Sequence, residues 1–535
     1  MFKKVNLYFH TLRYLKFKQV KYRFFYFFRS EWRKINKFKY DFFSQTPKAY
    51  IPQFSESIAS PITYIGINHF KFLNLEKKFE TEVDWDFTEF GKLWTYNLNY
   101  FEFLNQKDFV KENGLCLIND FTSKLPHLKN ALEPYPISLR IIFWTKFFIK
   151  LNESTQKVKP EIFASIYHQG KILESSLEYH LLGNHLLENG FGLFFNAYLF
   201  HDKSFYSKAK RILNIELKEQ ILNDGGHFEL SPMYHQIILF RLLDCINLAQ
   251  NNTYFEDNFL QFLEKKAELM LSWLNQITFE NGDIPLCNDA SNGIAPNSKS
   301  IFDYADRLKI PKTITPLTTS GYRKFLEKNY ECIIDVGNIG PDYIPGHAHS
   351  DTLSFELYVK NEPFIVDTGT STYEKNAQRQ SERSTSAHNT VQIGNIEQSE
   401  IWGGFRVARR AKARIIKETK KSVEATHDGY KKINTNHSRI FNFLESEIEI
   451  IDTISNSLNI GHAYFHFHPE VEIINLVDAC ASLKTIITTK GILEFENALQ
   501  VEIMSFEYAL EFNKLINSKK LVVKFRNKLV SKILI

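Results

Sequence analysis

The sequence has few cysteines, and their spacing fits neither a disulfide framework nor a thiolate metal site. The 535-residue chain holds five, none of them in a CxxC pair: Cys116, Cys245, Cys287, Cys332 and Cys480. An odd, scattered set argues against a fold held by disulfides and against zinc bound by cysteine. We therefore expect free thiols that are buried in the folded protein.

Long apolar runs and nucleotide-binding motifs are also missing. No uninterrupted run approaches the roughly 18 apolar residues of a membrane-spanning helix, so the sequence predicts no transmembrane segment. There is no GxxxxGK[ST], no strand-linked GxGxxG and no GxSxG. Nucleotide chemistry and a serine nucleophile on a sharp turn are therefore unsupported.

Net charge is small, but it is unevenly divided along the chain. The 66 Lys and Arg against 61 Asp and Glu give +5. Residues 1–40 carry 12 of the basic residues and one acid, Glu31, which leaves 54 basic and 60 acidic residues in the remainder. Because the body of the protein is mildly acidic, we expect no nucleic-acid partner.

The basic N-terminal segment predicts an amphipathic helix. Phe17, Val20, Phe24 and Phe28 recur at three- and four-residue spacing among Lys and Arg. Three interpretations stay open: a helix packed on the main domain, a helix docked on an anionic membrane surface or polyanion, and an export signal with an interrupted apolar core. We expect a cytoplasmic location or a peripheral one at the inner membrane, with the periplasm as the alternative.

Hydrophobic periodicity divides the remainder into two regions. After a mixed segment at 1–80, residues 81–320 show helical spacing and residues 321–535 show short alternating strands. Successive helical hairpins are typical of a bundle or an α/α toroid, and strands with few helices between them indicate an antiparallel β-sandwich. We expect a ligand site in the cleft between the two. Expected helices include 137–151, 161–181, 185–200, 204–221, 233–249 and 259–277, and expected strands include 333–336, 353–359, 364–366, 448–454, 464–468 and 521–525.

The densest group of reactive side chains is PGHAHSD at 345–351. On an extended segment, His347, His349 and Asp351 would share one face. Two imidazoles and a carboxylate suit zinc, and Asp367 and His388 are placed to converge on them. The alternative is that these are ordinary histidines on the surface of a strand.

The helical region offers two further polar breaks. GGHFELSPMYH at 225–235 contains Glu229, Tyr234 and His235, and GNHLLENG at 183–190 contains Asn184 and Glu188. Each has an ordinary explanation, a packing tyrosine in the first and a helix cap in the second. His, Tyr and Asn together suit removal of a proton next to a carboxylate, because a neutral donor stabilises the developing charge.

Carboxylates leave a second chemistry open. Asp283 and Asp289, in NGDIPLCNDAS, have the pattern of turn residues. Asp289 is nevertheless available, with Glu188 and Glu229, as a member of a carboxylate pair for glycoside hydrolysis.

Six motifs in order give the sequence its resemblance to the heparinase II/III family of polysaccharide lyases. They span roughly 130–395. The segments TLRYLKFKQVKYR and WTYNLNYFEFL further resemble a branch associated with bacterial surface-polysaccharide gene clusters. The six motifs are SLRIIFW, GNHLLENG, GGHFELSPMYH, GDIPLCND, PGHAHSDTLSFELYVKNEPFIVDTGTSTY and SAHNTV.

The resemblance implies an N-terminal incomplete α/α toroid, a C-terminal antiparallel β-sandwich and an active site between them. It implies β-elimination at a uronic acid of an anionic polysaccharide. Asn184, with His185 beside it, would neutralise the substrate carboxylate. Tyr234 would be the catalytic base or acid, and His347 its partner in proton transfer.

The resemblance also implies a zinc ion, with a structural role, held by His349, Asp367 and His388. Shaping or substrate-contacting roles fall to Arg140, Glu229, His235 and Arg383. An acidic body that binds an acidic glycan needs local cations, for which Arg379 is another candidate.

The alternatives to a lyase are a glycoside hydrolase and a non-catalytic glycan-binding protein in capsule or lipopolysaccharide biosynthesis.

Overall fold

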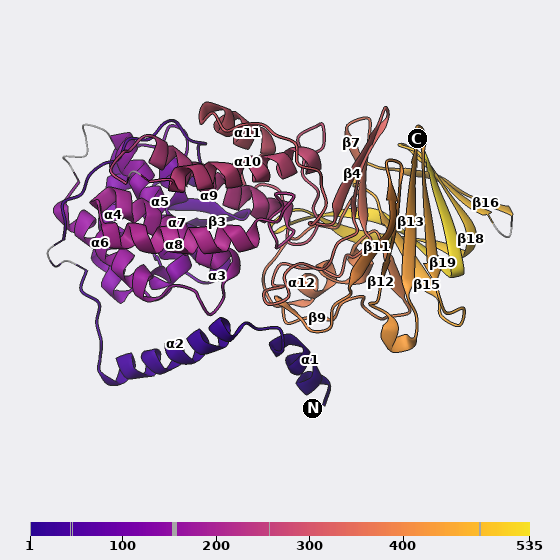
Figure 1. Ribbon diagram of the computed structural model, residues 1–535, viewed down its shortest axis with the longest axis horizontal. Coiled ribbons are helices and arrows are strands. Elements are labelled where there is room, and N and C mark those ends of the chain that lie inside the picture. Colours follow the sequence, from indigo (N-terminus) through magenta and orange to yellow (C-terminus); the bar gives the residue numbers. More distant parts are fainter. Residues whose placement is uncertain (1, 43, 45, 152–157, 256, 481–482) are drawn as a thin grey trace.

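The chain forms a helical half followed by a half built from antiparallel sheets (Figure 1). The computed structural model describes residues 2–42, 44, 46–151, 158–255, 257–480 and 483–535. Two N-terminal helices, α1 (Phe2–Leu12) and α2 (Phe17–Ile35), precede a small antiparallel sheet of β1 (Tyr64–Gly66), β2 (His69–Phe72) and β3 (Leu75–Lys78).

The helical half is a succession of helices, many of which pack on the next helix in the chain. Its members are α3 (Lys92–Tyr100), α4 (Lys111–Lys124), α5 (Pro134–Leu151), α6 (Pro160–Ser175), α7 (Gly183–Phe200), α8 (Lys203–Gln220), α9 (Pro232–Gln250), α10 (Phe259–Ile277) and α11 (Ser298–Arg307).

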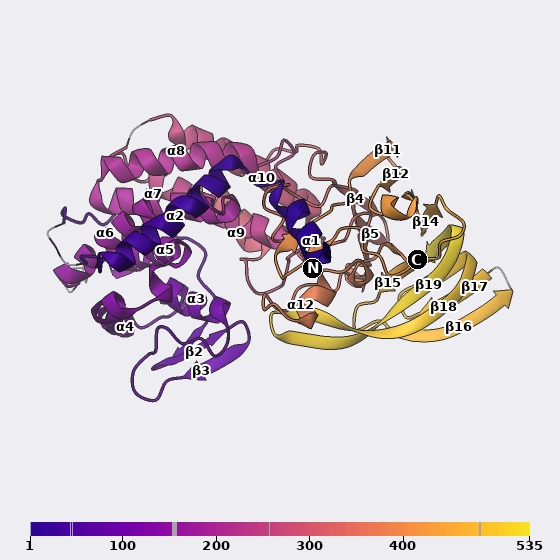
Figure 2. The ribbon, with the colours of Figure 1, turned by 90° about the horizontal axis from the view of Figure 1, so that it is seen from below.

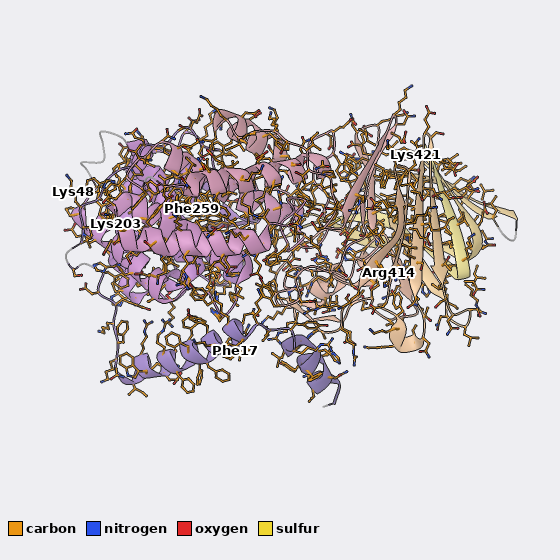
Figure 3. All side chains as sticks on the ribbon, in the orientation of Figure 1. Phe17, Lys48, Lys203, Phe259, Arg414 and Lys421 are labelled. Atoms are coloured by element: carbon orange, nitrogen blue, oxygen red, sulfur yellow. The ribbon has the colours of Figure 1, made fainter. Side chains whose placement is uncertain are left out.

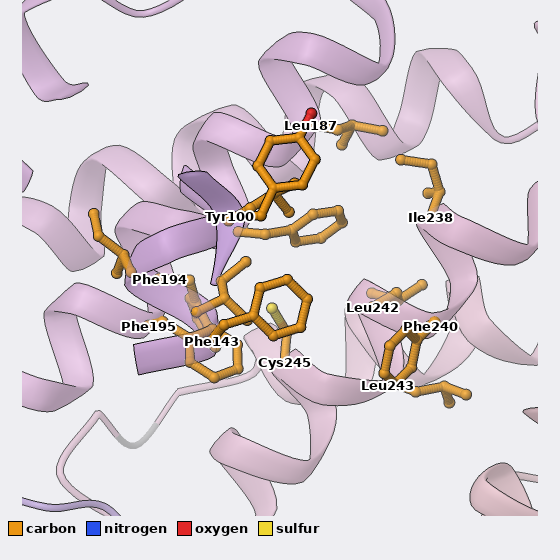
Figure 4. Close-up of a cluster of buried hydrophobic side chains, with 14 of the residues drawn as sticks. Tyr100, Phe143, Leu187, Phe194, Phe195, Ile238, Phe240, Leu242, Leu243 and Cys245 are labelled. Carbon is orange, nitrogen blue, oxygen red and sulfur yellow. The ribbon is translucent and has the colours of Figure 1, made fainter. Parts of the chain in front are cut away.

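Helix α7 lies at the centre of this half, against α5, α8 and α9. All its residues except His185 are buried, as expected of a helix that is apolar on every side. At Gly192 a Cβ atom would lie 2.7 Å from the Cα of Ser138, so glycine permits the close approach of α5. Phe143, Phe194, Leu242 and other apolar side chains fill the space between the helices (Figure 4).

The second half contains two main antiparallel sheets. A four-stranded sheet has the order β4-β5-β6-β7, and a ten-stranded sheet runs β11-β12-β13-β14-β19-β18-β17-β16, with β15 pairing β19 and β8. The short pair β9 and β10 and the helix α12 (Ala377–Glu382) lie beside them. The strands are β4 (Tyr322–Glu327), β5 (Tyr330–Asp335), β6 (Phe355–Val359), β7 (Glu362–Ile365), β8 (Val391–Ile393), β9 (Ile401–Trp402), β10 (Arg406–Val407), β11 (Ala413–Thr419), β12 (Ser422–His427), β13 (His437–Leu444), β14 (Glu447–Ile454), β15 (Gly461–His466), β16 (Ile473–Cys480), β17 (Leu483–Thr488), β18 (Ile492–Glu511) and β19 (Lys514–Leu534).

A shared apolar core joins the two sheets. Ile334 and Leu357 of the smaller sheet belong to the same buried cluster as Phe441 and Ile450 of the larger one. Alternation of buried and exposed residues along β13 and β14 places one face of the larger sheet inward. The β18–β19 hairpin reaches the helical half, where Asn513 Nδ2 donates a hydrogen bond to Leu73 O at 2.9 Å (Figure 2).

The order of helices followed by antiparallel sheets, predicted from periodicity, is confirmed. The helix expected at 259–277 has those bounds, whereas the one expected at 161–181 ends at Ser175. The next residue, Ser176, has φ −127° and ψ 27°, outside the α-helical region, so the helix ends before it. Within the described residues, no helix combines the length and hydropathy needed to cross a bilayer.

Two local expectations were wrong. Residues 345–351 form an irregular loop and not an extended strand. Of the cysteines whose side chains are described, Cys245, Cys287 and Cys332 are buried and free, but Cys116 is exposed. The side chain of Cys480 lies outside the described part of the chain.

Candidate functional site

The candidate site lies where loops of the two halves meet. The 347–349 loop, between β5 and β6, lies against residues 288 and 289, which follow α10. Asp289 N donates to His347 O at 3.0 Å, and His349 N donates to Asn288 Oδ1 at 2.9 Å. These bonds hold residues nearly 60 positions apart in a fixed relation.

Asp289 is the centre of this arrangement. Its carboxylate accepts hydrogen bonds from His347 Nδ1 and His349 Nε2, each at 2.8 Å, and from both terminal nitrogens of Arg379. Burial alone would raise the pKa of Asp289, but the Arg379 guanidinium and the two imidazoles hold it well below its usual range. Asp289 is therefore a buried, ionised acceptor; it lies in a turn, as expected, but that turn is buried.

His347 presents its second ring nitrogen to the helical half. An ionised Asp289 accepts a hydrogen bond from Nδ1–H, so a neutral His347 keeps its lone pair on Nε2. That atom lies 3.4 Å from Nδ2 of Asn184 and 3.7 Å from Oε2 of Glu229. The arrangement gives His347 the geometry of a proton acceptor.

Asn184 stands at the N-terminus of α7 and is held by Glu229. Its Nδ2 donates to Glu229 Oε2 at 2.8 Å and its backbone N–H to Oε1 at 3.2 Å. The preceding Gly183 has a φ of +59°, and a Cβ there would lie 2.8 Å from Glu229 Oε1. Glycine is therefore required for the carboxylate to reach the helix end, where N–H groups favour negative charge.

Tyr234 lies in the first turn of α9, directly beside His347. The two ring centroids are 4.0 Å apart, and the Tyr234 hydroxyl lies 3.1 Å from that of Tyr373. Ser231 caps the helix by accepting from Tyr234 N, while its own hydroxyl donates to Asp289 O at 2.8 Å. Burial raises the pKa of Tyr234, so the phenol keeps its proton.

His185 is paired with a carboxylate. Its Nδ1 lies 3.1 Å from Oε1 of Glu178, and its ring packs on Tyr135 with centroids 4.8 Å apart. Burial opposes the charged imidazole, but the Glu178 carboxylate raises the pKa of His185. His185 is the one residue of α7 that is not buried, and its side chain is about a third exposed (33%).

A pocket of about 160 Å³ adjoins Tyr234. Its lining includes Glu188 and Arg241, whose Oε1 and Nε atoms are 3.7 Å apart. Within the described residues, neither carboxylate oxygen of Glu188 has a hydrogen-bond partner, and burial raises its pKa to about 7. The pocket therefore offers a buried acid and a guanidinium among aromatic walls that include Tyr100, Tyr135 and Tyr373.

Three residues expected to contact substrate lie in the protein interior. Arg140 donates to Gln169, to Asn99 O and to Ala131 O. His235 Nε2 donates to Met270 O at 3.0 Å, and burial lowers its pKa to about 3. Arg383 donates to Ala348 O and Gly404 O and so supports the 347–349 loop. All three side chains are fully enclosed, so they support the fold around the site and do not line its surface.

The three residues expected to hold zinc lie close together but are engaged with other partners. His388 Nδ1 lies 2.6 Å from Asp367 Oδ2, and His349 Nε2 is bonded to Asp289. The rings of His349 and His388 are 5.3 Å apart, and their remaining nitrogens are buried with no partner among the described residues. Among all the residues that the structure describes, no group of three His, Cys, Asp or Glu side chains is arranged to hold a metal ion.

The pattern-based interpretation missed Tyr373, in TGTSTY, whose hydroxyl faces that of Tyr234. It named Asp289 and Arg379 but not their pairing, which anchors both histidines. The GDIPLCND motif contained the signal for Asp289, but turn-forming neighbours gave it a simpler explanation. Asp351, expected beside His347 and His349, is buried with no partner for Oδ2 among the described residues.

Comparisons with known proteins cover most of the chain. Residues 102–307 match the description "Heparinase II/III N-terminus", and residues 309–533 match "Heparinase II/III-like, C-terminal". Heparin-sulfate lyases from Bacteroides stercoris and Pedobacter heparinus are each 25% identical, over 55% and 57% of this chain. The matches cover 50% and 48% of those proteins, so the chain spans about half of their length.

Solved structures share the fold. One of heparinase III superposes with a TM-score of 0.64 at 16% identity, over 85% of this chain and 80% of that one. A heparan sulfate lyase from Pedobacter heparinus gives 0.57 at 18% identity, over 94% and 86%. Helices followed by antiparallel sheets are thus common to all three chains.

Proposed function

Because the chain belongs to the heparinase II/III family, we propose that it is a lyase that cleaves a uronic-acid-containing polysaccharide by β-elimination. One observation carries the proposal: Tyr234, which lines the pocket, lies close to His347, and His347 lies close to Asn184, so that both halves of the chain contribute. The ring centroids of Tyr234 and His347 are 4.0 Å apart, and His347 Nε2 is 3.4 Å from Asn184 Nδ2.

In the proposed reaction, His347 accepts the proton at C5 of the uronate. The C4–O bond then breaks, a C4=C5 double bond forms, and the departing oxygen takes a proton from Tyr234. The Asp289 carboxylate supports this direction because it holds the proton on Nδ1 of His347 and leaves Nε2 free. The raised pKa of Tyr234 supports it too, because a neutral phenol is a proton donor.

The substrate carboxylate must be neutralised for C5 to become acidic. We assign this role to Asn184 and to His185, which lies beside it at the N-terminus of α7 and whose pKa is raised by the Glu178 carboxylate. A helix N-terminus, an amide and an imidazolium all favour negative charge that develops nearby. Glu229 positions Asn184 and also lies beside His347, with its Oε2 3.7 Å from Nε2.

Zinc binding by His349, Asp367 and His388 is part of the proposal, in a structural role. Its support is the proximity of the three residues and the two buried ring nitrogens that have no partner among the described residues. Bound zinc would stabilise the loops that carry His347 and His388. The proton transfers need only Tyr234 and His347.

We also propose that the substrate is a bacterial surface polysaccharide or its biosynthetic intermediate. Of the residues that line the pocket, those with charged side chains are Glu102, Glu188 and Arg241. The pocket thus has one guanidinium, that of Arg241, and it already faces the carboxyl group of Glu188. Such a pocket suits a glycan of low charge density better than a heavily sulfated one.

The test is incubation with a panel of uronate polymers while the ultraviolet absorbance of the unsaturated product is followed. Absorbance should appear with one class of polymer and be lost in His347→Ala. Reducing ends without the chromophore would identify a hydrolase, and glycan binding without turnover would identify a binding protein. Wild-type activity in His347→Ala would overturn the assigned roles.

A further inference from the structure

The N-terminal helices α1 and α2 lie along one face of the molecule, beneath both halves (Figures 1 and 2). Each is attached to the body. Trp402 Nε1 donates to Thr11 Oγ1 at 3.1 Å, and Gln19 Nε2 donates to Leu181 O at 3.0 Å and Tyr343 O at 3.3 Å. The two helices are therefore fixed parts of the fold.

Helix α2 turns its polar side toward the protein. Along this side, hydroxyl, amide and guanidinium groups donate to backbone carbonyls of the body, and the ring of Tyr22 packs on Tyr179 with centroids 4.7 Å apart. The residues that make these contacts are Gln19, Tyr22, Tyr26 and Arg29. Because they are spaced by three and four positions, they form one face of the helix.

The opposite side of α2 is apolar and faces solvent. We call this row the outer stripe: its five large side chains are between 59% and 81% exposed. Figure 3 labels Phe17 at the end of α2 nearest α1. A soluble helix normally shows the reverse arrangement, with its apolar side on the core. The outer stripe consists of Phe17, Phe24, Phe28, Trp32 and Ile35.

Helix α1 also exposes apolar side chains. Val5, Phe9 and Leu12 are spaced by four and three residues and are between 53% and 62% exposed. Exposed apolar groups of this kind mark a surface that binds something.

Positive charge surrounds the outer stripe. Residues 1–40 carry 12 Lys and Arg against the single acid Glu31. Lys21, Lys37 and Lys39 are exposed, and Lys34 is 69% exposed. Aromatic and aliphatic side chains beside Lys and Arg are the pattern of helices that lie in the plane of a membrane surface.

We propose that the outer stripe, together with the exposed side of α1, docks the protein on an anionic lipid bilayer. Anionic headgroups would neutralise the basic side chains while the aromatic rings enter the acyl boundary. A second copy of the chain is a poor occupant, because it would bring another strongly basic segment against this one. A soluble polyanion is also a poor occupant, because it would pair with the basic side chains and leave the outer stripe exposed to water.

The experiment is co-flotation of the full chain with vesicles of phosphatidylcholine, with and without phosphatidylglycerol. We expect binding to the anionic vesicles, weakening as salt is added, and a blue shift of Trp32 emission that is absent in Trp32→Phe. The double variant Phe24→Ser/Phe28→Ser should bind about tenfold more weakly or worse, since each ring loses its burial. Its turnover of a soluble polymer should be unchanged.

A matched control removes equally exposed apolar groups elsewhere. Ile314→Ser/Leu458→Ser changes residues that are 79% and 85% exposed in connecting segments elsewhere, and it should bind vesicles as the wild type does. Absence of binding to either vesicle, binding that Phe24→Ser/Phe28→Ser leaves intact, or self-association through the same residues would each overturn the proposal. None of these outcomes bears on the lyase reaction.

Discussion

Oδ2 of Asp289 lies 2.8 Å from Nδ1 of His347, and this contact joins the two halves of the chain at the candidate site. Asp289 follows the last long helix of the helical half, and His347 lies on a loop between strands. One carboxylate thus sets the tautomer of the proposed base and fixes the position of the 347–349 loop.

Asp289→Asn should destabilise the fold as well as abolish activity. The change leaves the buried Arg379 without its ionic partner, and loss of one member of a buried pair costs about 3–5 kcal/mol. Denaturant unfolding measures the effect. Asp283→Asn, an exposed aspartate on the same connection, is the control and should change stability by about 0.5 kcal/mol or less. Similar stability of the two variants would contradict the role given to Asp289.

Tyr234→Phe should lower the turnover number by about 10²–10⁴ while the fold remains intact, because only the proposed proton donor is lost. Tyr373→Phe is the matched control, since it removes the other hydroxyl of the same 3.1 Å contact. It should reduce turnover far less. Equal losses in the two variants, measured by the unsaturated product, would show that the contact itself is what matters.

Stability should depend on pH through Glu188. Its pKa in the folded chain is about 7, above the value of about 4.5 for an unfolded glutamate. The contribution is complete below pH 4.5 and is lost as pH rises through 7, by up to roughly 3 kcal/mol. Melting temperatures of wild type and Glu188→Gln, compared at pH 5 and pH 7.5, test this. Between pH 5 and pH 7.5 the wild type should lose stability relative to Glu188→Gln. A difference in melting temperature that stays constant between the two pH values would refute the prediction.

Elemental analysis of the purified protein should find about one zinc per chain. His388→Ala should lose the metal. His466→Ala should keep it, because both ring nitrogens of that buried histidine already have partners in Asn389 and Ser386. An intact, soluble protein without zinc would show that the three residues serve only as a hydrogen-bonded group.

Local physics was sufficient for the order of the elements. Apolar spacing placed α10 at its observed bounds, and the switch to alternating residues predicted the sheets of the second half. The sequence also singled out Asn184, Tyr234 and His347, because polar residues that interrupt a periodic pattern stand out without any knowledge of their neighbours.

Partners distant along the chain were beyond such patterns. Asp289 lies in a turn, as its neighbours predicted, but its contacts with the 347–349 loop and Arg379 were not predictable. Arg140 and Arg383 were candidates for glycan contact, but both donate to buried carbonyls. The sequence likewise predicted an amphipathic helix over α2, but which side would meet the protein depended on carbonyls such as Leu181 O. The sequence by itself determined which residues are reactive and which segments are periodic; only the tertiary structure decided their partners, because hydrogen bonds and burial depend on contacts between segments far apart in the chain.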